Sequence, residues 1–496
     1  MTTDKQITDN EITKPKVARL RFAPSPTGFM HLGNFRTALF GYLLAKSLGG
    51  EFILRLEDTD QKREVAGALD KLLAILDWVG IRFDEGPHLG GPHAPYVQSE
   101  RLAIYNEYCN QLLATGQAYR CFCSSERLTK MREEQAAKKQ APRYDGTCRD
   151  LSEAEITQRL SKGEQFVIRQ KMPLDGEVVV VDELRGEIKF LAKDLDDQVL
   201  IKSNGVPTYH FASVVDDHLM EITHVTRGDE WLPSYPKNIL LYRAFNWTPP
   251  KFIHLPLILN KVGGGKLSKR QGDVFLEQYK DQGYLPEALI NFSALLGWHG
   301  KDDKEIYSLA ELEKVFSLTG LGASPAVFDI EKLDYFNALY IRQKSLSELT
   351  DLTIPFLPDF MRNYPRQQLE SFLALAQERM KRLNEAPELI SFLFKLPDYD
   401  KSLLFWKDLT ATDIVSNLQG LQELLTTVPE TDWQTEELSE LIFAWIVERG
   451  KKNGPVLWPL RVALSGLKHS PTPFEIASAL GKTESLKRIQ LALDWF

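Results

Sequence analysis

The chain has 496 residues, which is too long for a single hydrophobic core, so we expect several domains. Apolar residues make up 43% and charged residues 26%, values that favour an ordinary soluble globular protein. No apolar run approaches the length of a membrane span, and the polar residues 1–16 lack the apolar segment of a secretory signal. With four cysteines, three of them clustered, we expect no disulfide framework and a cytoplasmic location.

The formal net charge of −8 argues against nucleic-acid binding over the whole surface, because such binding requires a basic footprint. We therefore expect any such footprint to be local. Residues 231–272 contain no Asp or Glu and end in a basic loop. We interpret this stretch as a phosphate-facing surface, and the alternative is a solvated basic surface.

The first predicted elements alternate between strands and helices. Residues 17–22 predict a strand, and an apolar helix over 32–47 follows it and is stopped by Gly49 and Gly50. A second strand over 52–56 and a helix over 65–79 complete a βαβα order. This order predicts a parallel sheet with ligand sites at the carboxyl ends of its strands.

Two loops in this part of the chain carry the chemistry. A Pro-, Ser- and Gly-rich turn precedes His31 at the start of the first helix, where free N–H groups and the positive helix end favour a phosphate. Three glycines at 263–265 precede the basic loop 266–270, whose cations would neutralise a triphosphate. Together the two loops predict a mononucleotide site that is closed from two sides.

The remaining elements fall into an insertion, a return to the nucleotide fold and a helical tail. The chain leaves the sheet through the Gly- and Pro-rich residues 86–95, and an inserted domain follows. Strands are predicted in the insertion at 165–171 and 177–182, nucleotide-fold character returns at 209–215, 222–226 and 252–259, and helices are predicted at 348–356, 368–383 and 436–449.

Several motifs in one order resemble the class I aminoacyl-tRNA synthetases, and among them the bacterial-type glutamyl-tRNA synthetases. The motifs are residues 21–28, 31–34, 55–60, 91–101, 207–211, 214–217, 227–231 and 266–270. They cover the first half of the chain, and the helical tail matches in character. The resemblance implies a Rossmann-type α/β catalytic domain with an α+β insertion, followed by an all-α anticodon-binding region.

The resemblance also implies the order of the domains. The expected segments are a flexible tail (1–16), the catalytic domain in two halves (17–95 and 207–258), an insertion that binds the tRNA acceptor end (96–206), a stem-contact region with the basic loop (259–340) and two helical anticodon-binding subdomains (341–400 and 401–496).

For ATP, the resemblance implies a site at both loops. The expected ATP-binding residues are Gly28, His31, Gly33, Lys266, Ser268 and Lys269, and the expected catalytic residues are His31, Lys266, Lys269 and Arg270. Mg²⁺ is expected to accompany ATP, held chiefly by phosphate oxygens and water. Taken alone, each of these lysines could be an ordinary loop lysine.

For glutamate, the resemblance implies one partner for each charge. Glu57 with Ser25 is expected to bind the ammonium group, Arg21 with Tyr209 the side-chain carboxylate, and Arg227 the α-carboxylate. Arginine suits this role because its planar fork pairs with a carboxylate through two hydrogen bonds. Structural ion pairs are the alternative for each residue. Asp216 and Asp217 are expected to shape a turn and a helix start.

Three cysteines and an aspartate resemble the zinc site of part of this family. Cys121, Cys123, Cys148 and Asp150 would be its four ligands, with Asp150 at a position where zinc-binding relatives mostly have His. A vestigial site is an equal alternative. Arg379, in the helical stretch 377–383, loosely matches an arginine that checks the last anticodon base. A solvated helix face is the alternative for Arg379.

The function implied is ATP-dependent attachment of L-glutamate to the 3′ end of tRNA-Glu through a glutamyl-adenylate, by a monomer. Among the rivals, the helical tail opposes a glutaminyl enzyme, and the length opposes a short relative that modifies a tRNA base. A small-molecule nucleotidylyltransferase would not need the insertion or the tail. A silent tRNA-binding paralogue is opposed by the complete set of expected catalytic residues. Whether tRNA-Gln is also charged stays open.

Overall fold

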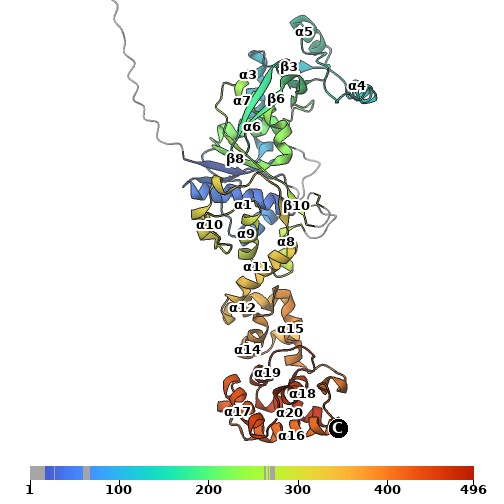
Figure 1. The fold of residues 1–496 in the computed structure, drawn as a ribbon. Coiled ribbons are helices and arrows are strands. Elements are labelled where there is room, and N and C mark those ends of the chain that lie inside the picture. Colours follow the sequence, from blue (N-terminus) through green and yellow to red (C-terminus); the bar gives the residue numbers. More distant parts are fainter. Residues whose placement is uncertain (1–16, 27, 60–66, 262–263, 266, 268–273) are drawn as a thin grey trace, which may run out of the picture. The chain divides into compact units, whose positions relative to one another are not determined.

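The computed structural model describes residues 17–26, 28–59, 67–261, 264–265, 267 and 274–496. The chain forms two compact units (Figure 1). The first contains the residues up to Gln278 together with Leu289–Ile330, and the second contains Tyr279–Ala288 and Glu331–Phe496. Within the described ranges, no helix is long and apolar enough to cross a bilayer.

A six-stranded sheet forms the centre of the first unit, in the order β2-β1-β8-β9-β5-β6. Its strands are β1 (Arg19–Phe22), β2 (Glu51–Leu54), β5 (Glu177–Asp182), β6 (Gly186–Leu191), β8 (His224–Gly228) and β9 (Lys251–Leu255). All neighbours are parallel except the β5–β6 hairpin. The predicted parallel sheet is therefore confirmed. The hairpin falls inside the segment expected to be an insertion, yet it extends the main sheet.

The order of the strands creates a switch point between β1 and β8. From β1 the chain continues through a helix to β2 on one side, whereas β8 is followed by β9 on the other side. In open α/β sheets, ligands bind in the crevice outside the carboxyl ends of the strands at such a point. Residues that follow Phe22 and Gly228 therefore lie where a ligand is expected.

Helix α1 (Leu32–Ser47) lies against the strands beside this crevice (Figure 1). It has the bounds predicted from the sequence, and it packs against β1, β2, β8 and α10 (Leu309–Val315). Because it is covered on several sides, its apolar residues are not confined to one stripe. Gly41 allows the close approach, since a Cβ there would lie 3.0 Å from the Thr226 hydroxyl.

The rest of the first unit carries a second sheet and several helices. Strands β3 (Ala118–Cys121), β4 (Val167–Gln170) and β7 (Val199–Ile201) form an antiparallel sheet, and β10 (Ile258–Asn260) pairs in parallel with β11 (Ala326–Phe328). The helices are α2 (Ala68–Trp78), α3 (Leu102–Ala114), α4 (Ser125–Ala137), α5 (Glu153–Ser161), α6 (Tyr209–Leu219) and α7 (Tyr235–Ala244), with the short turns η2 (Gln98–Arg101), η3 (Ala192–Asp194), η4 (Asp229–Ser234) and η6 (Leu318–Gly320).

The second unit is all-helical in its described residues, as the sequence predicted. Its α-helices are α12 (Leu346–Thr353), α13 (Asp359–Arg362), α14 (Arg366–Gln377), α15 (Ala386–Phe394), α16 (Ala411–Thr427), α17 (Thr435–Glu448), α18 (Asn453–Ser465), α19 (Pro473–Leu480) and α20 (Lys482–Leu493), with the turns η7 (Ile354–Phe356), η8 (Leu383–Glu385), η9 (Lys401–Leu404) and η10 (Glu430–Asp432). Helices α8 (Leu276–Asp281), α9 (Pro286–Leu295) and α11 (Ile330–Arg342) contribute residues to both units.

Two local predictions need correction. Asp216 and Asp217 do not start a helix, because they lie in the second half of α6, where both are buried. The helical stretch predicted around Arg379 is also interrupted, since α14 ends at Gln377. Arg379 is exposed in the turn that follows, where its N–H donates to the Ala376 carbonyl at 2.9 Å.

One buried arginine ties together three segments of the second unit. Arg488 on α20 is fully buried, and its guanidinium donates to the carbonyl oxygens of Phe392 (2.7 Å), Leu393 (3.2 Å) and Leu464 (2.8 Å). Its Nε also donates to Glu484 at 3.0 Å. These carbonyls lie at the ends of α15 and α18, where helices leave carbonyl groups without intrahelical partners. Arg488 therefore satisfies two helix ends at once.

We predict that Arg488→Met lowers the free energy of unfolding by about 3 kcal/mol, because it leaves buried carbonyl groups without donors. Urea unfolding followed by tryptophan fluorescence measures the change. Lys487→Met, at the neighbouring exposed position of α20, is the matched control and should change stability by less than about 0.5 kcal/mol. Equal effects of the two substitutions would contradict this role of Arg488.

Candidate active site

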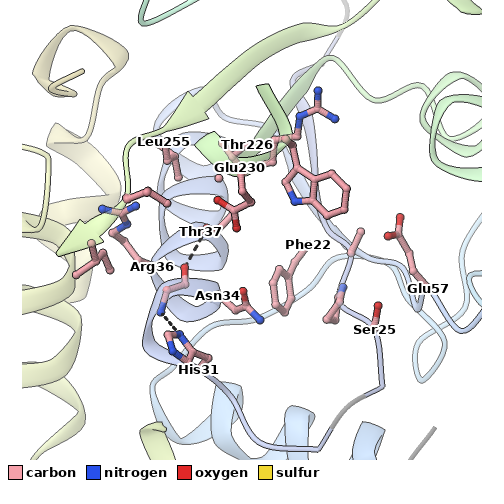
Figure 2. Close-up of a pocket in the computed structure, with 18 of the residues that line it drawn as sticks. Phe22, Ser25, His31, Asn34, Arg36, Thr37, Glu57, Thr226, Glu230 and Leu255 are labelled. Atoms are coloured by element: carbon pink, nitrogen blue, oxygen red, sulfur yellow. Dashed lines mark hydrogen bonds between the residues drawn. The ribbon is translucent and has the colours of Figure 1, made fainter. Parts of the chain in front are cut away.

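A cavity of about 780 Å³ lies at the carboxyl ends of β1 and β8, at the switch point of the sheet (Figure 2). Its walls include residues that follow β1 and β2, the first turns of α1, and residues that follow β8 and β9. Figure 2 shows His31, Asn34 and Thr37 of α1 on one side, with Ser25 and Glu57 on the other. The cavity therefore lies where the βαβα pattern predicted a ligand site.

His31 is the N-cap residue of α1 and lines this cavity. Its Nδ1 accepts a hydrogen bond from the Gly33 N–H at 3.0 Å, so the neutral ring carries its proton on Nε2. Gly33 lines the same cavity, whereas Gly28, with a φ of +101°, lines a smaller neighbouring hollow. The positive end of α1 and a ring N–H donor thus face one space, an arrangement that suits a phosphate.

One residue of the basic loop and the segment that follows the loop reach this cavity. Leu267 is buried, lines the cavity and donates its N–H to the Ile258 carbonyl at 2.9 Å. Beyond the loop, the Val274 carbonyl accepts from the Leu32 N–H at 2.8 Å, and the Phe275 ring lies edge-on to His31, 6.1 Å between centroids. Leu267 and the segment that follows the loop therefore border the same space as the start of α1.

Four residues of the loop itself lie outside the described residues, namely Lys266, Ser268, Lys269 and Arg270. Their predicted contacts with ATP stay predictions. Of the basic stretch before the loop, Lys251 is exposed at the amino end of β9, the end of the strand away from the cavity. The prediction that residues 231–272 face the phosphate therefore does not hold for the whole stretch.

A buried cluster of charges lies on the other side of the cavity. The Asp217 carboxylate accepts from Arg21 Nε (2.9 Å) and Nη2 (3.3 Å), and from Arg55 Nη1 (2.7 Å). Arg55 also donates to Glu57 at 3.0 Å. Asp217 therefore joins β1, the end of β2 and α6. Since a buried charge without a partner costs several kcal/mol, these groups stabilise one another.

Asp216, next to Asp217, is the centre of a second buried network. Its carboxylate accepts from Arg101 Nε (2.7 Å), Gln98 Nε2 (2.9 Å) and the Tyr105 hydroxyl (2.8 Å). Arg55 Nε lies 3.7 Å away. These donors come from η2 and α3, so Asp216 attaches the start of the region expected to be an insertion to the charge cluster at the cavity.

Glu57 has an unusual protonation equilibrium. Its carboxyl is buried, and this burial outweighs the nearby Arg55 and Arg21 and raises the pKa of Glu57 to about 7. The Tyr209 ring also lines the cavity, packs against Trp231 with 4.6 Å between centroids, and has its pKa raised to about 12, mainly by burial. A cation that enters this cavity would favour the ionised form of Glu57.

Arg227, at the end of β8, is held differently from Arg21. Its Nε donates to His254 Nε2 at 2.9 Å, and its two Nη atoms donate to Asn238 Oδ1 at 3.2 and 3.3 Å. These acceptors are neutral, and within the described part of the chain no carboxylate lies within ion-pair distance of Arg227. Burial accordingly lowers the pKa of Arg227. Arg227 is a buried cation suited to an anionic ligand.

The structure thus brings seven of the twelve residues predicted for ATP, catalysis and glutamate around one cavity. The five residues predicted to bind glutamate line it together with His31 and Gly33; these five are Arg21, Ser25, Glu57, Tyr209 and Arg227. Sequence reasoning gave no role to Arg55, Asn238 and His254, and it placed Asp217 at a turn rather than beside the arginines. Arg55 could have been found, because it lies two residues before Glu57 and so on the same face of an extended segment.

A separate group of thiols lies outside the cavity. The Sγ atoms of Cys121, Cys123 and Cys148 all lie within 4.8 Å of one another, and those of Cys123 and Cys148 are 3.6 Å apart. Asp150 is exposed and lies outside this group. The hydroxyl of Tyr144 lies 3.3 Å from Cys121 Sγ and 3.6 Å from Cys123 Sγ. The structure therefore brings three of the four predicted zinc ligands together, with Tyr144 beside them.

Comparison with known families agrees with this arrangement. Residues 17–335 match the model of the class I tRNA synthetase catalytic domain for glutamate and glutamine (E and Q). Residues 348–493 match an anticodon-binding domain. The two matches together cover most of the chain.

Curated relatives and solved structures match along nearly the whole chain. A glutamate–tRNA ligase of Clostridium novyi is 45% identical over 97% of this chain and 98% of its own length. One from Clostridium tetani is 46% identical over 96% of this chain and 97% of its own length. The crystal structure of a glutamate tRNA ligase from Elizabethkingia meningosepticum in complex with its amino acid superimposes with a TM-score of 0.90 at 38% identity, and covers 97% of this chain and 99% of that one.

Proposed function

The chain belongs to the class I tRNA synthetases for glutamate and glutamine, and we propose on that premise that it attaches L-glutamate to the 3′ end of tRNA-Glu at the expense of ATP. The observation that supports this proposal best is the composition of the cavity. A helix N-terminus with His31 borders one side of it, while a buried carboxylate and two buried arginines border the other. These groups complement a triphosphate and an amino acid with two carboxylates.

In the proposed first step, an oxygen of the glutamate α-carboxylate attacks the α-phosphorus of ATP. The bond from that phosphorus to the bridging oxygen breaks, and pyrophosphate leaves. His31 and the positive end of α1 would face phosphate oxygens, together with Lys266, Lys269 and Arg270 of the loop. Mg²⁺ bound to the phosphates would supply further neutralisation of charge.

In the second step, a hydroxyl of the terminal ribose of tRNA attacks the carbonyl carbon of the glutamyl-adenylate. The hydroxyl releases its proton to solvent, and AMP leaves with the electrons of the broken bond. Described side chains around the cavity include no obvious nucleophile for a covalent intermediate, so we infer that positioning and electrostatics carry the catalysis. Tyr209 and Trp231 form an aromatic wall beside the substrate.

For glutamate we propose the charge pairing that the sequence predicted. Glu57, with Ser25, binds the ammonium group; Arg21 with Tyr209 binds the side-chain carboxylate; and Arg227 binds the α-carboxylate. Asp217 already neutralises part of Arg21, whereas Arg227 has only neutral acceptors among the described residues. Glutamine would place a neutral amide, which is in part an N–H donor, against the N–H donors of Arg21. It would lose one charged hydrogen-bonded pair there, which disfavours glutamine.

The identity of the reaction is tested by aminoacylation of tRNA-Glu and tRNA-Gln transcripts with labelled glutamate and glutamine. We expect glutamate to be attached to tRNA-Glu and glutamine to be refused. Lys269→Ala should lower kcat/KM for ATP on the order of a hundredfold, because a cation that stabilises the transition state is lost.

Lys251→Ala, at the amino end of β9, is the matched control and should stay within about twofold. If glutamine were attached and glutamate refused, the proposed substrate would be wrong. An unchanged rate for Lys269→Ala would remove the role proposed for the loop. The outcome with tRNA-Gln decides whether the second tRNA is also charged.

The pKa of Glu57 predicts how glutamate binding depends on pH. Glu57 pairs with the ammonium group only when ionised, and it becomes neutral as the pH falls through about 7. We therefore expect the KM for glutamate to rise about tenfold between pH 8 and pH 6, with the KM for ATP nearly constant. Glu57→Gln should raise this KM at pH 8 and abolish its pH dependence. A variant that kept the wild-type profile would show that another group titrates.

We further propose that the three thiols bind zinc. Zn–S bonds of about 2.3 Å place tetrahedral sulfur ligands about 3.8 Å apart, close to the 3.6 Å between the sulfurs of Cys123 and Cys148. The fourth donor is taken to be the Tyr144 oxygen, since it lies among the thiols whereas Asp150 does not. Zinc would join β3 to the segment that carries Tyr144 and Cys148.

Competition with a chromophoric zinc chelator tests this site. We expect one zinc per chain in the wild type, at least about tenfold weaker binding for Tyr144→Phe, and unchanged binding for Asp150→Ala. Loss of zinc in Asp150→Ala but not in Tyr144→Phe would assign the fourth position to Asp150. A wild-type chain that binds no zinc would mean that the site is vestigial.

Three proposals rest on the sequence and the family alone. Arg379 is exposed in the second unit, so it is accessible to a tRNA base, and its role in reading the anticodon stays a prediction. The monomeric state and the cytoplasmic location stay predictions as well.

A further inference from the structure

We propose that His254 and Asp182 form a positioning relay that holds Arg227 ready for a carboxylate of the substrate without neutralising it. The inference rests on the proposed function, in which Arg227 binds glutamate. It goes further by assigning a role to two residues that do not line the cavity.

The relay is a chain of short hydrogen bonds across three neighbouring strands. Asp182 lies at the end of β5, His254 on β9 and Arg227 on β8. Asp182 Oδ2 lies 2.8 Å from His254 Nδ1, and Arg227 Nε lies 2.9 Å from His254 Nε2. The side chains of Asp182 and His254 are wholly buried. Parallel pairing of β5 with β9 and of β9 with β8 places the three residues side by side.

The hydrogen bonds define the tautomer of His254. The guanidinium of Arg227 can only donate, so His254 Nε2 must be an unprotonated acceptor. Nδ1 then carries the proton and donates to Asp182. Burial and the nearby charge of Arg227 lower the pKa of His254, which agrees with a neutral ring.

Both carboxylate oxygens of Asp182 already accept hydrogen bonds. Its Oδ1 accepts from the N–H groups of Leu184 (3.0 Å) and Arg185 (3.1 Å). Its Oδ2 accepts from both the backbone N–H and the ring of His254. Because both oxygens face donors only, an amide at this position would direct an NH₂ group at another donor. The carboxylate is therefore specific for the Nδ1–H form of His254.

The relay leaves the charge of Arg227 available to an anionic ligand. A carboxylate in direct contact would occupy the N–H groups of Arg227, as Asp217 does with Arg21. Here the imidazole ring of His254 separates the carboxylate of Asp182 from the guanidinium of Arg227. Within the described residues, Arg227 directs three of its five N–H bonds at His254 and Asn238, and two remain for a ligand. Asp182 thus stabilises the buried cation at a distance while the substrate supplies the direct partner.

Two substitutions at His254 separate positioning from packing. His254→Phe keeps a ring of similar shape but removes the acceptor, whereas His254→Gln keeps an acceptor oxygen near Nε2. In aminoacylation assays with the full chain and tRNA-Glu, we expect His254→Phe to raise the KM for glutamate about tenfold or more. His254→Gln should stay within about threefold, and the KM for ATP should change less than about twofold in both.

Asp182→Asn provides an independent test if His254→Phe does not fold. It should also raise the KM for glutamate severalfold and leave the KM for ATP nearly unchanged, because the amide no longer selects the Nδ1–H tautomer. Equal effects of His254→Phe and His254→Gln, or equal rises in both KM values, would overturn the relay, since packing alone would then explain them. An Asp182→Asn enzyme with wild-type KM values would also overturn it.

Arg227→Ala distinguishes failure of the relay from failure of the proposed function. If this variant kept the wild-type KM for glutamate, the proposed role of Arg227 itself would be wrong. If Arg227→Ala raised the KM strongly while His254→Phe and Asp182→Asn did not, only the relay would be wrong.

Discussion

The ion pairs that Asp217 makes with Arg21 and Arg55 are the interactions on which the rest of the site depends. They join β1, the end of β2 and α6, segments that are far apart in the chain. All three charges are buried, so any one of them without its partners would cost several kcal/mol. The sheet, α6 and this side of the cavity are therefore expected to form together.

Two of the arginines that line the cavity, Arg21 and Arg227, differ in their partners. Arg21 shares a carboxylate with Arg55, whereas Arg227 is surrounded by neutral acceptors, with Asp182 behind His254. Asp217 partly neutralises Arg21, whereas no carboxylate among the described residues contacts Arg227 directly. Glu57, whose pKa is raised to about 7, completes a site in which charges are held in place before the substrate arrives. Such preorganised charges act strongly because they need no rearrangement when the substrate reacts.

The nucleotide side of the cavity depends on backbone geometry rather than on buried charge. His31 caps α1 with its Nδ1, and the chain at Val274 and Leu276 hydrogen-bonds to the backbone just before and at the start of that helix. Two segments more than two hundred residues apart in the sequence therefore border one space. The loop that carries the predicted phosphate-binding lysines has Leu267 at this cavity, and the chain that follows it at Val274 lies at the start of α1.

The sequence by itself determined the parallel sheet, the bounds of α1, the helical tail and seven of the residues now found around the cavity. These features are local or repeated patterns, such as apolar periodicity, turn residues and short motifs, and they are readable one segment at a time. Only the tertiary structure decided that β5 and β6 extend the main sheet, that Asp216 and Asp217 hold arginines, and that Tyr144 rather than Asp150 lies among the thiols. Each of these depends on which distant residue meets a buried polar group, and local patterns do not specify that partner.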